Sequence, residues 1–167
     1  MTPDNLQAAL VEDLAQLFDG ETFASSAGEA RPLRVYAQEV PPMAGWDETD
    51  RQQEAPEPYL IVRLLEGSIA DPDSPQTVSV VLVICLYDAG DQRQGHRDVL
   101  HVIARIVERY GENRVVRPSA GLTGGAPFTA QYPIKWALQE DDTRPYYFGG
   151  VSLNFEAPAI CQEVPFI

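Results

Sequence analysis

The most apolar stretch of the chain covers residues 78–87 and reads Val-Ser-Val-Val-Leu-Val-Ile-Cys-Leu-Tyr. Ten residues are too few to span a bilayer as a helix, and the many Val and Ile residues favour a strand. Alternation places Val80, Leu82, Ile84 and Leu86 on one face of this strand and Val81, Val83, Cys85 and Tyr87 on the other. Because both faces are apolar, we predict a central strand that is buried on both sides.

Two other segments show the three- and four-residue spacing of an amphipathic helix. The first runs from about residue 3 to 18; Thr2 and Pro3 suit its N-cap and first position, and Gly20 suits its C-cap. The second spans about 94–110. The expected buried residues are Leu6, Ala9, Leu10, Leu14, Leu17 and Phe18 in the first helix and Val99, Val102, Ile103, Ile106, Val107 and Tyr110 in the second.

Four more segments have the pattern of strands: 32–37, 59–65, 131–139 and 146–156. An acidic turn joins 59–65 to 78–87, so these two strands should form an antiparallel hairpin, and the last two strands should form another. The order of elements predicts one α+β domain over residues 1–167. It should contain an antiparallel sheet of about four to five strands with two helices packed on one face.

A long acidic, proline-rich loop at about 38–57 separates the first two predicted strands. Loops of this length without periodicity are usually functional or mobile. Its Trp46 is expected to fold back onto the domain or to dock on a partner. Since two helices cover one face of the sheet, the second face is left either to the N-terminal helix and this loop or to another subunit.

Charge limits the partners of the chain. With 25 acidic and 12 basic residues the net charge is −13, which argues against a broad electrostatic grip on nucleic acid or anionic lipid and is explained by solubility. The N-terminus lacks the basic and apolar parts of a signal peptide, and no segment has membrane-spanning length, so we expect cytosolic synthesis. Cys85 and Cys161 make no disulfide framework, and Cys85 is expected to be a small buried hydrophobe.

The sequence contains only fragments of catalytic and metal-binding motifs. His96 and His101 are five residues apart on one helix and therefore on different faces. The pairs Asp71 with Asp73 and Asp88 with Asp91 lack the ligand series of a calcium loop, and the glycines of 121–125 lack a following Lys-Ser/Thr. No Gly-x-Ser-x-Gly elbow is present. We therefore expect no catalytic, cofactor or metal site.

Several short segments carry a family resemblance. They read Tyr87-Asp88, Gly95-His96-Arg97-Asp98-Val99-Leu100, Tyr132-Pro133-Ile134-Lys135-Trp136 and Tyr146-Tyr147-Phe148-Gly149-Gly150-Val151. Together with residues 59–67 they resemble small tail proteins of tailed phages and prophages over about residues 58–160. The resemblance implies a tail terminator, also called a tail-completion or minor tail protein.

Such a resemblance implies a structural virion protein without enzymatic activity or cofactors. It would form a ring, typically a hexamer, that caps the tail tube, ends tail polymerisation and presents the head-tail joining surface. Its partners would be copies of itself, the tail tube protein and a head-completion or neck protein, with DNA only as cargo in the lumen and no membrane. It would lie in the host cytoplasm during assembly and then in the virion tail.

The expected contact surface and two alternative functions complete the prediction. The face of the central strand without helices should contact a subunit or partner through Val81, Val83, Tyr87, Trp46, Tyr146 and Phe148. One alternative function is another head-tail connector, neck or tube-like phage protein. The other is a small ligand-binding or hydrolase domain, which a concave pocket with convergent polar groups would indicate.

Overall fold

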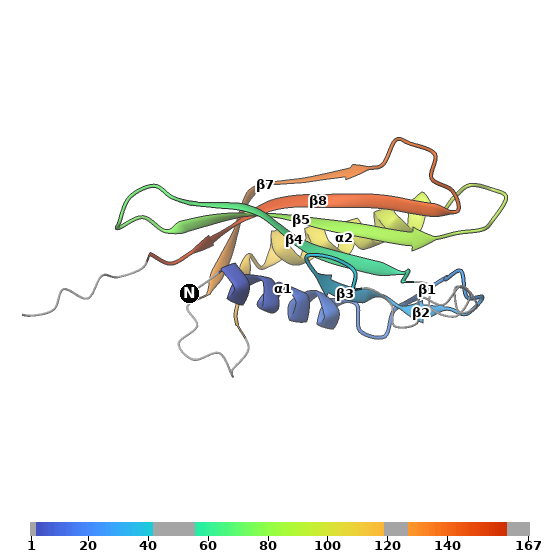
Figure 1. The fold of residues 1–167 in the computed structure, drawn as a ribbon, viewed down its shortest axis with the longest axis horizontal. Coiled ribbons are helices and arrows are strands. Elements are labelled where there is room, and N and C mark those ends of the chain that lie inside the picture. The colour runs from blue at the N-terminus through green and yellow to red at the C-terminus, as the bar shows by residue number, and fades with distance from the viewer. Residues whose placement is uncertain (1–2, 42–55, 119–126, 160–167) are drawn as a thin grey trace, which may run out of the picture.

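The computed structural model of the chain describes residues 3–41, 56–118 and 127–159. Its elements, in order, are α1 (Pro3–Leu17), β1 (Thr22–Phe23), β2 (Arg31–Pro32), β3 (Arg34–Ala37), β4 (Tyr59–Ile69), β5 (Gln76–Tyr87), α2 (His96–Glu112), β6 (Val115–Val116), β7 (Phe128–Leu138) and β8 (Tyr146–Ala157). Six strands form one sheet in the order β3-β4-β5-β8-β7-β6, and β1 and β2 form a small second sheet (Figure 1).

The predicted α+β class and both hairpins are confirmed, but the purely antiparallel sheet of four to five strands was wrong. The sheet has six strands, and β3 pairs in parallel with β4, from Arg34 opposite Tyr59 to Ala37 opposite Val62. A parallel pair needs a long connection, and residues 38–58 separate the two strands in the sequence. The predicted strand at 32–37 is divided, because Pro32 belongs to β2 and β3 begins only at Arg34.

Strand β5 is central, as predicted, with β4 on one side and β8 on the other. Its face toward the helices is fully buried at Val80, Leu82, Ile84 and Leu86. Burial on both sides was wrong for most of the opposite face, where Cys85 is buried but Val81, Val83 and Tyr87 are only half-buried. The reason is that both helices lie on the same side of the sheet.

Helix α1 packs on β3 and β4, whereas α2 packs on β5, β7 and β8. An ion pair joins the helices, since Arg109 Nη2 lies 2.8 Å from Asp13 Oδ1. The Tyr110 hydroxyl donates to Asp13 Oδ2 at 3.0 Å, and its buried ring meets Phe155 edge-on at 5.7 Å. Burial, followed by the nearby Asp13 carboxylate, raises the pKa of Tyr110. The two helices therefore form one layer.

The sheet curls around this layer. Helix α1 contacts β3 and β4 at one end of the strand order and β6 at the other. Beyond the short strand β3, the side chain of Gln38 continues the pairing with β4. Its Oε1 accepts from the Leu64 backbone N–H at 3.1 Å, and its Nε2 donates to the Leu64 carbonyl at 3.2 Å. The amide thus occupies the place of one further strand residue.

Two glycines allow α2 to approach the sheet closely. A Cβ on Gly149 of β8 would lie 2.5 Å from Val99 Cγ1 and 3.3 Å from Ile103 Cδ1 of α2. A Cβ on Gly95, just before α2, would overlap the ring of Tyr147. Real Cβ atoms do not approach neighbours so closely, so larger residues at these positions would push the helix away from the sheet.

Replacing Gly149 tests this close approach. Gly149→Ala should lower the free energy of unfolding by roughly 1–3 kcal/mol, because the added methyl group overpacks a buried contact. Gly150→Ala is the matched control, since a Cβ there meets only the Leu82 carbonyl oxygen at 3.4 Å and should change stability by less than about 1 kcal/mol. Urea unfolding of both variants measures the difference, and equal losses would contradict the proposed constraint.

Candidate assembly surface

The side of the sheet that points away from both helices carries a largely apolar and aromatic surface. We call it the open face. Alternation along the strands and the register between them place the following residues on it: Tyr36, Tyr59, Ile61, Val81, Val83, Cys85, Tyr87, Tyr146 and Phe148. Arg34 and Arg63 point to the same side, opposite Tyr59 and Val81. The surface is therefore built from four adjacent strands, β3, β4, β5 and β8.

Five of the six residues predicted for the contact surface meet on the open face. Tyr87 lies opposite Tyr146, with ring centroids 5.7 Å apart, and Phe148 lies opposite Cys85. Val83 and Val81 continue the same row along β5. The sixth predicted residue, Trp46, lies outside the described residues. The structure thus brings the five together, and their role as an interface stays a prediction.

Three residues of the open face were missed by sequence reasoning. Tyr59 and Ile61 lie opposite Cys85 and Val83 in the β4–β5 hairpin, so the predicted hairpin contained enough information to find them. Tyr36 depends on the parallel pairing of β3 with β4, for which the sequence shows no local signal. Its ring lies 6.5 Å from that of Tyr59 and extends the aromatic surface.

One end of the open face is closed by a buried carboxylate. Glu57 is 2% exposed, and its Oε1 accepts from the backbone N–H of Ser26 at 3.1 Å. Burial, with a smaller contribution from Glu57, raises the pKa of the Cys85 thiol to about 11. Burial and the neighbouring Cys85 likewise raise the pKa of Tyr59. The thiol is therefore held protonated, which opposes nucleophilic chemistry.

The other end of the open face is more accessible. Val81 is half-buried, and Ser152 beside it on β8 is exposed. The next row is polar, where Ser79 Oγ donates to Asn154 Oδ1 at 2.8 Å. The apolar part of the surface thus lies between a closed end at Glu57 and a polar end at Ser79.

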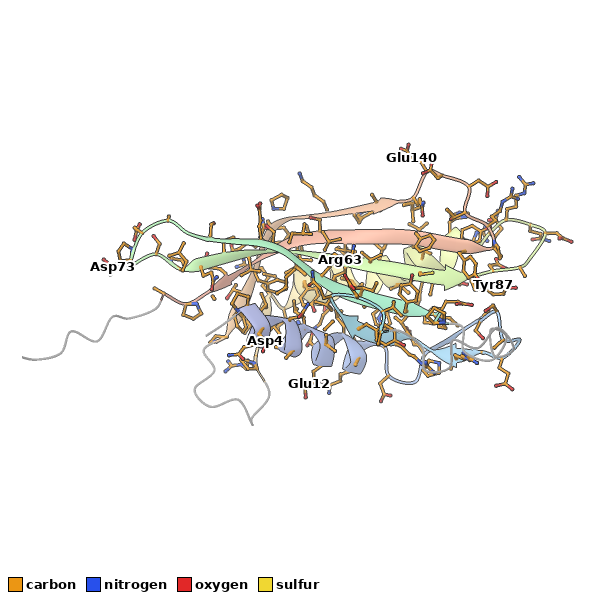
Figure 2. The ribbon with its side chains drawn as sticks, viewed as in Figure 1. Asp4, Glu12, Arg63, Asp73, Tyr87 and Glu140 are labelled. Atoms are coloured by element: carbon orange, nitrogen blue, oxygen red, sulfur yellow. The ribbon has the colours of Figure 1, made fainter. Side chains whose placement is uncertain are left out.

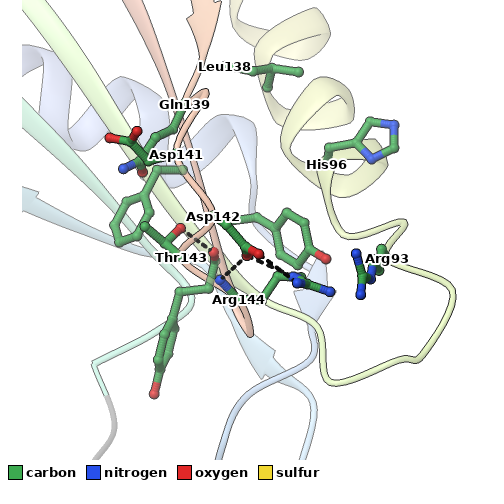
Figure 3. A pocket seen from close by; sticks show the side chains of 11 residues that line it. Arg93, His96, Leu138, Gln139, Asp141, Asp142, Thr143 and Arg144 are labelled. Carbon is green, nitrogen blue, oxygen red and sulfur yellow. Dashed lines mark hydrogen bonds and ion pairs between the residues drawn. The ribbon is translucent and has the colours of Figure 1, made fainter.

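A cavity of about 200 Å³ lies between the start of α2 and the turn that joins β7 to β8 (Figure 3). Two carboxylates and two guanidiniums line it, those of Asp141, Asp142, Arg93 and Arg144. One carboxylate and one guanidinium already bind each other, because Arg144 donates from Nε and Nη2 to Asp142 at 2.7 and 2.6 Å. These bonds lower the pKa of Asp142 to about 2. Thr143 Oγ1 donates to the carbonyl of Tyr146 at 2.8 Å. The polar groups of the turn thus stabilise the turn itself.

The two histidines lie apart, as their spacing predicts. His96 lines this cavity, whereas His101 Nε2 lies 3.3 Å from Glu21 Oε1 at the α1 side of α2. Within the described residues, no group of three His, Cys, Asp or Glu side chains is arranged to hold a metal ion. In the same part of the chain, neither helix is long and apolar enough to cross a membrane.

The exposed large apolar side chains lie mainly on two sheet edges. Leu65 and Ile69 of β4 are 60% and 48% exposed, and Tyr132 and Trp136 of β7 are 61% and 54% exposed. Tyr146, at 36%, belongs to the open face. The predicted interface set contained Tyr146 but none of the four edge residues, because alternation gives the direction of a side chain and not what covers it.

Comparison with known proteins shows the fold alone. No known protein family matches the sequence, and no curated protein matches it. A solved structure of a protein without a functional name matches over 99% of both chains, with a TM-score of 0.55 and 17% sequence identity. At this identity the match shows that the described residues share a known fold.

The buried thiol on the open face gives a direct test of the site. In a Cys161→Ser background, Cys85 should react with iodoacetamide at least roughly tenfold more slowly in the native chain than in urea, because it is both buried and protonated at pH 8. The rate should rise as the pH approaches 11, where the thiol deprotonates. Mass spectrometry measures the labelling, and fast native labelling at pH 8 would show that this end of the open face is uncovered.

Proposed function

We propose that the protein is a tail terminator of a tailed phage or prophage. In this role several copies form a ring, six being expected, that caps the tail tube, ends its polymerisation and presents the surface for head joining. The partners are copies of the chain itself, the tube protein and a head-completion protein. Assembly takes place in the host cytoplasm, and the protein then remains in the virion tail.

The observation that carries the proposal is that the segments with the family resemblance pack against one another. Gly95 faces the ring of Tyr147, and Gly149 faces Val99. The backbone N–H of Asp88 donates to the carbonyl of Pro145 at 2.9 Å. The strand-to-helix step and the last hairpin therefore form one structural unit. The segments that carry the resemblance thus act together in shaping the fold. This structural role is the one expected in a family whose members act by assembly.

The open face supports the same proposal. A subunit of a larger assembly needs surface that a neighbour can cover, and half-buried valines and tyrosines beside one another provide it. A closed ring requires two different patches of one subunit to meet head to tail. The net charge of −13 suits a lumen through which DNA passes without binding, although solubility explains it equally well.

The first experiment measures the assembly directly. Light scattering and negative-stain images of the purified chain should show six-fold rings, and addition of the chain to polymerising tube protein from the same genome should shorten the tubes. A strict monomer at high concentration that leaves tube length unchanged would contradict the proposal. Rings with a different role in the neck would leave tube length unchanged as well, which separates the connector alternative from the terminator.

A substitution on the open face tests its role. Val83→Glu places a charge among apolar neighbours, so we expect it to abolish either ring formation or tube capping while the chain remains folded. Val107→Glu is the matched control, because Val107 is also half-buried but lies on α2. Circular dichroism verifies the fold of both variants. If both variants assemble like the parent chain, the open face is not the contact surface.

A further inference from the structure

One free edge of the sheet is acidic. Beyond Leu64, where the Gln38 side chain bonds to β4, no described strand pairs with the outer side of β4. The hairpin that β4 forms with β5 extends past the start of α1 (Figure 1). We call residues 65–75 the acidic arm. It carries Glu66, Asp71 and Asp73 and no basic residue, together with exposed Leu65 and Ile69. Asp73 marks its tip, at the far end of the sheet from Tyr87 (Figure 2).

The opposite free edge is basic. β6 pairs only with the start of β7, at Phe128 and Thr129, and no described strand covers the outer side of residues 131–138. We call residues 114–117 and 128–138 the basic edge. It carries three exposed basic residues and no acidic one: Arg114, Arg117 and Lys135. Exposed Tyr132 and Trp136 lie among them, with the Arg114 guanidinium 6.0 Å from the centre of the Tyr132 ring.

The basic edge is unusual in a chain with a net charge of −13. Three of the 12 basic residues lie within residues 114–138, where no acidic residue occurs in the sequence. Arg105, Arg109 and Arg144, by contrast, already form ion pairs with nearby carboxylates. Two copies of the chain repel each other in most orientations, because both are strongly acidic. An acidic surface of one copy is attracted where it meets the basic edge of another.

The two charged edges are separated by other strands within one molecule. Strands β5 and β8 lie between β4 and β7 in the sheet, so the acidic arm and the basic edge belong to opposite edges of the sheet. Each edge carries the charge and the exposed apolar pair that complement the other. Contacts between two different patches of identical chains are head to tail, and they form a ring when the rotation from one copy to the next closes and an open filament when it does not.

Neither edge is suited to extending the sheet of another copy by regular backbone pairing. Pro133 lacks an N–H, and the register of β7 against β8 shifts between Gln131 and Lys135. β4 has a similar irregularity between Leu64 and Glu66. Prolines, lysines and bulges at an edge prevent the regular backbone pairing that leads to aggregation. Leu65 and Ile69 are therefore expected to pack on Tyr132 and Trp136 within a rim of opposite charges.

We propose that the acidic arm of one copy binds the basic edge of the next copy, and that this contact joins neighbouring subunits head to tail. The assignment of the resulting assembly to a tail ring rests on the proposed function. The contact itself rests on the two edges and is tested without any phage protein. Self-association of the chain should weaken as salt is added, because exposed charges are screened.

A charge exchange tests the contact. In Glu66→Lys/Asp73→Lys the acidic arm is reversed, and in Arg117→Glu/Lys135→Glu the basic edge is reversed; all four side chains are exposed. Each variant should self-associate roughly tenfold or more weakly than the parent chain. Combining all four substitutions should restore association, because opposite charges again meet. Sedimentation velocity over a concentration series at low salt measures the dissociation constants.

The matched control carries the same total charge without the complementary arm. It combines Arg117→Glu/Lys135→Glu with Glu140→Lys/Asp141→Lys on the turn between β7 and β8, which returns the net charge to −13. This control should remain as weak as the basic-edge variant. Equal recovery in the control and in the exchanged variant would overturn the proposal. So would a parent chain that stays monomeric at about 1 mM, the limit of a weak interaction.

Cross-linking tests the head-to-tail geometry. In a Cys161→Ser background, Ser68→Cys marks the acidic arm and Ala137→Cys marks the basic edge, and both positions are exposed. The native Cys85 is buried and does not compete. A short bismaleimide should join the chains only when the two variants are mixed. Cross-linking of either variant with itself at equal yield would indicate a two-fold contact and overturn the proposal.

The outcomes separate this contact from the proposed function. Charge exchange that behaves as expected, in a chain that leaves tube length unchanged, would support the contact and reject the tail terminator. Shortened tubes together with unaltered association in the reversed variants would support the tail terminator and reject the contact.

Discussion

Two helices can seal only one face of a six-stranded sheet, and the rest of the structure depends on this limit. Leu82 and Ile84 of β5 are buried on the side of the sheet that carries the helices, whereas Val83 between them is half-buried on the other side. The helix layer is held together by Asp13, which binds both Arg109 and Tyr110. Because the helices are tied to each other on one side, the open face is left for the remainder of the chain or for another molecule.

Local patterns predicted the elements well, and pairings at long range less well. The helix ends were predicted to within two residues, because the apolar spacing of each helix is a local property. The parallel pairing of β3 was missed since it joins strands that residues 38–58 separate in the sequence. Strand β6 has two residues, Val115 and Val116, and is too short to show any alternation. Register and partner are tertiary properties, which periodicity does not encode.

The candidate surfaces show the same division. Val81, Val83 and Tyr87 of the open face were found from alternation in β5, but their degree of burial was overestimated. Trp136 lies on the same face of β7 as Ile134 and Leu138, which pack on the core, yet it is 54% exposed. The direction of a side chain follows from the sequence, whereas its burial depends on how far the neighbouring helix extends over it. The opposite charges of the two sheet edges are visible in the sequence, but their placement on opposite sides requires the topology.

The Gln38 side chain has a consequence for the behaviour of the protein at high concentration. Its amide forms the two hydrogen bonds that an incoming peptide would otherwise make with Leu64. A side chain, unlike a strand, offers no further backbone groups on its outer side, so pairing stops at this point. The Gln38 side chain is therefore a local barrier to fibril-like growth at this edge of the sheet.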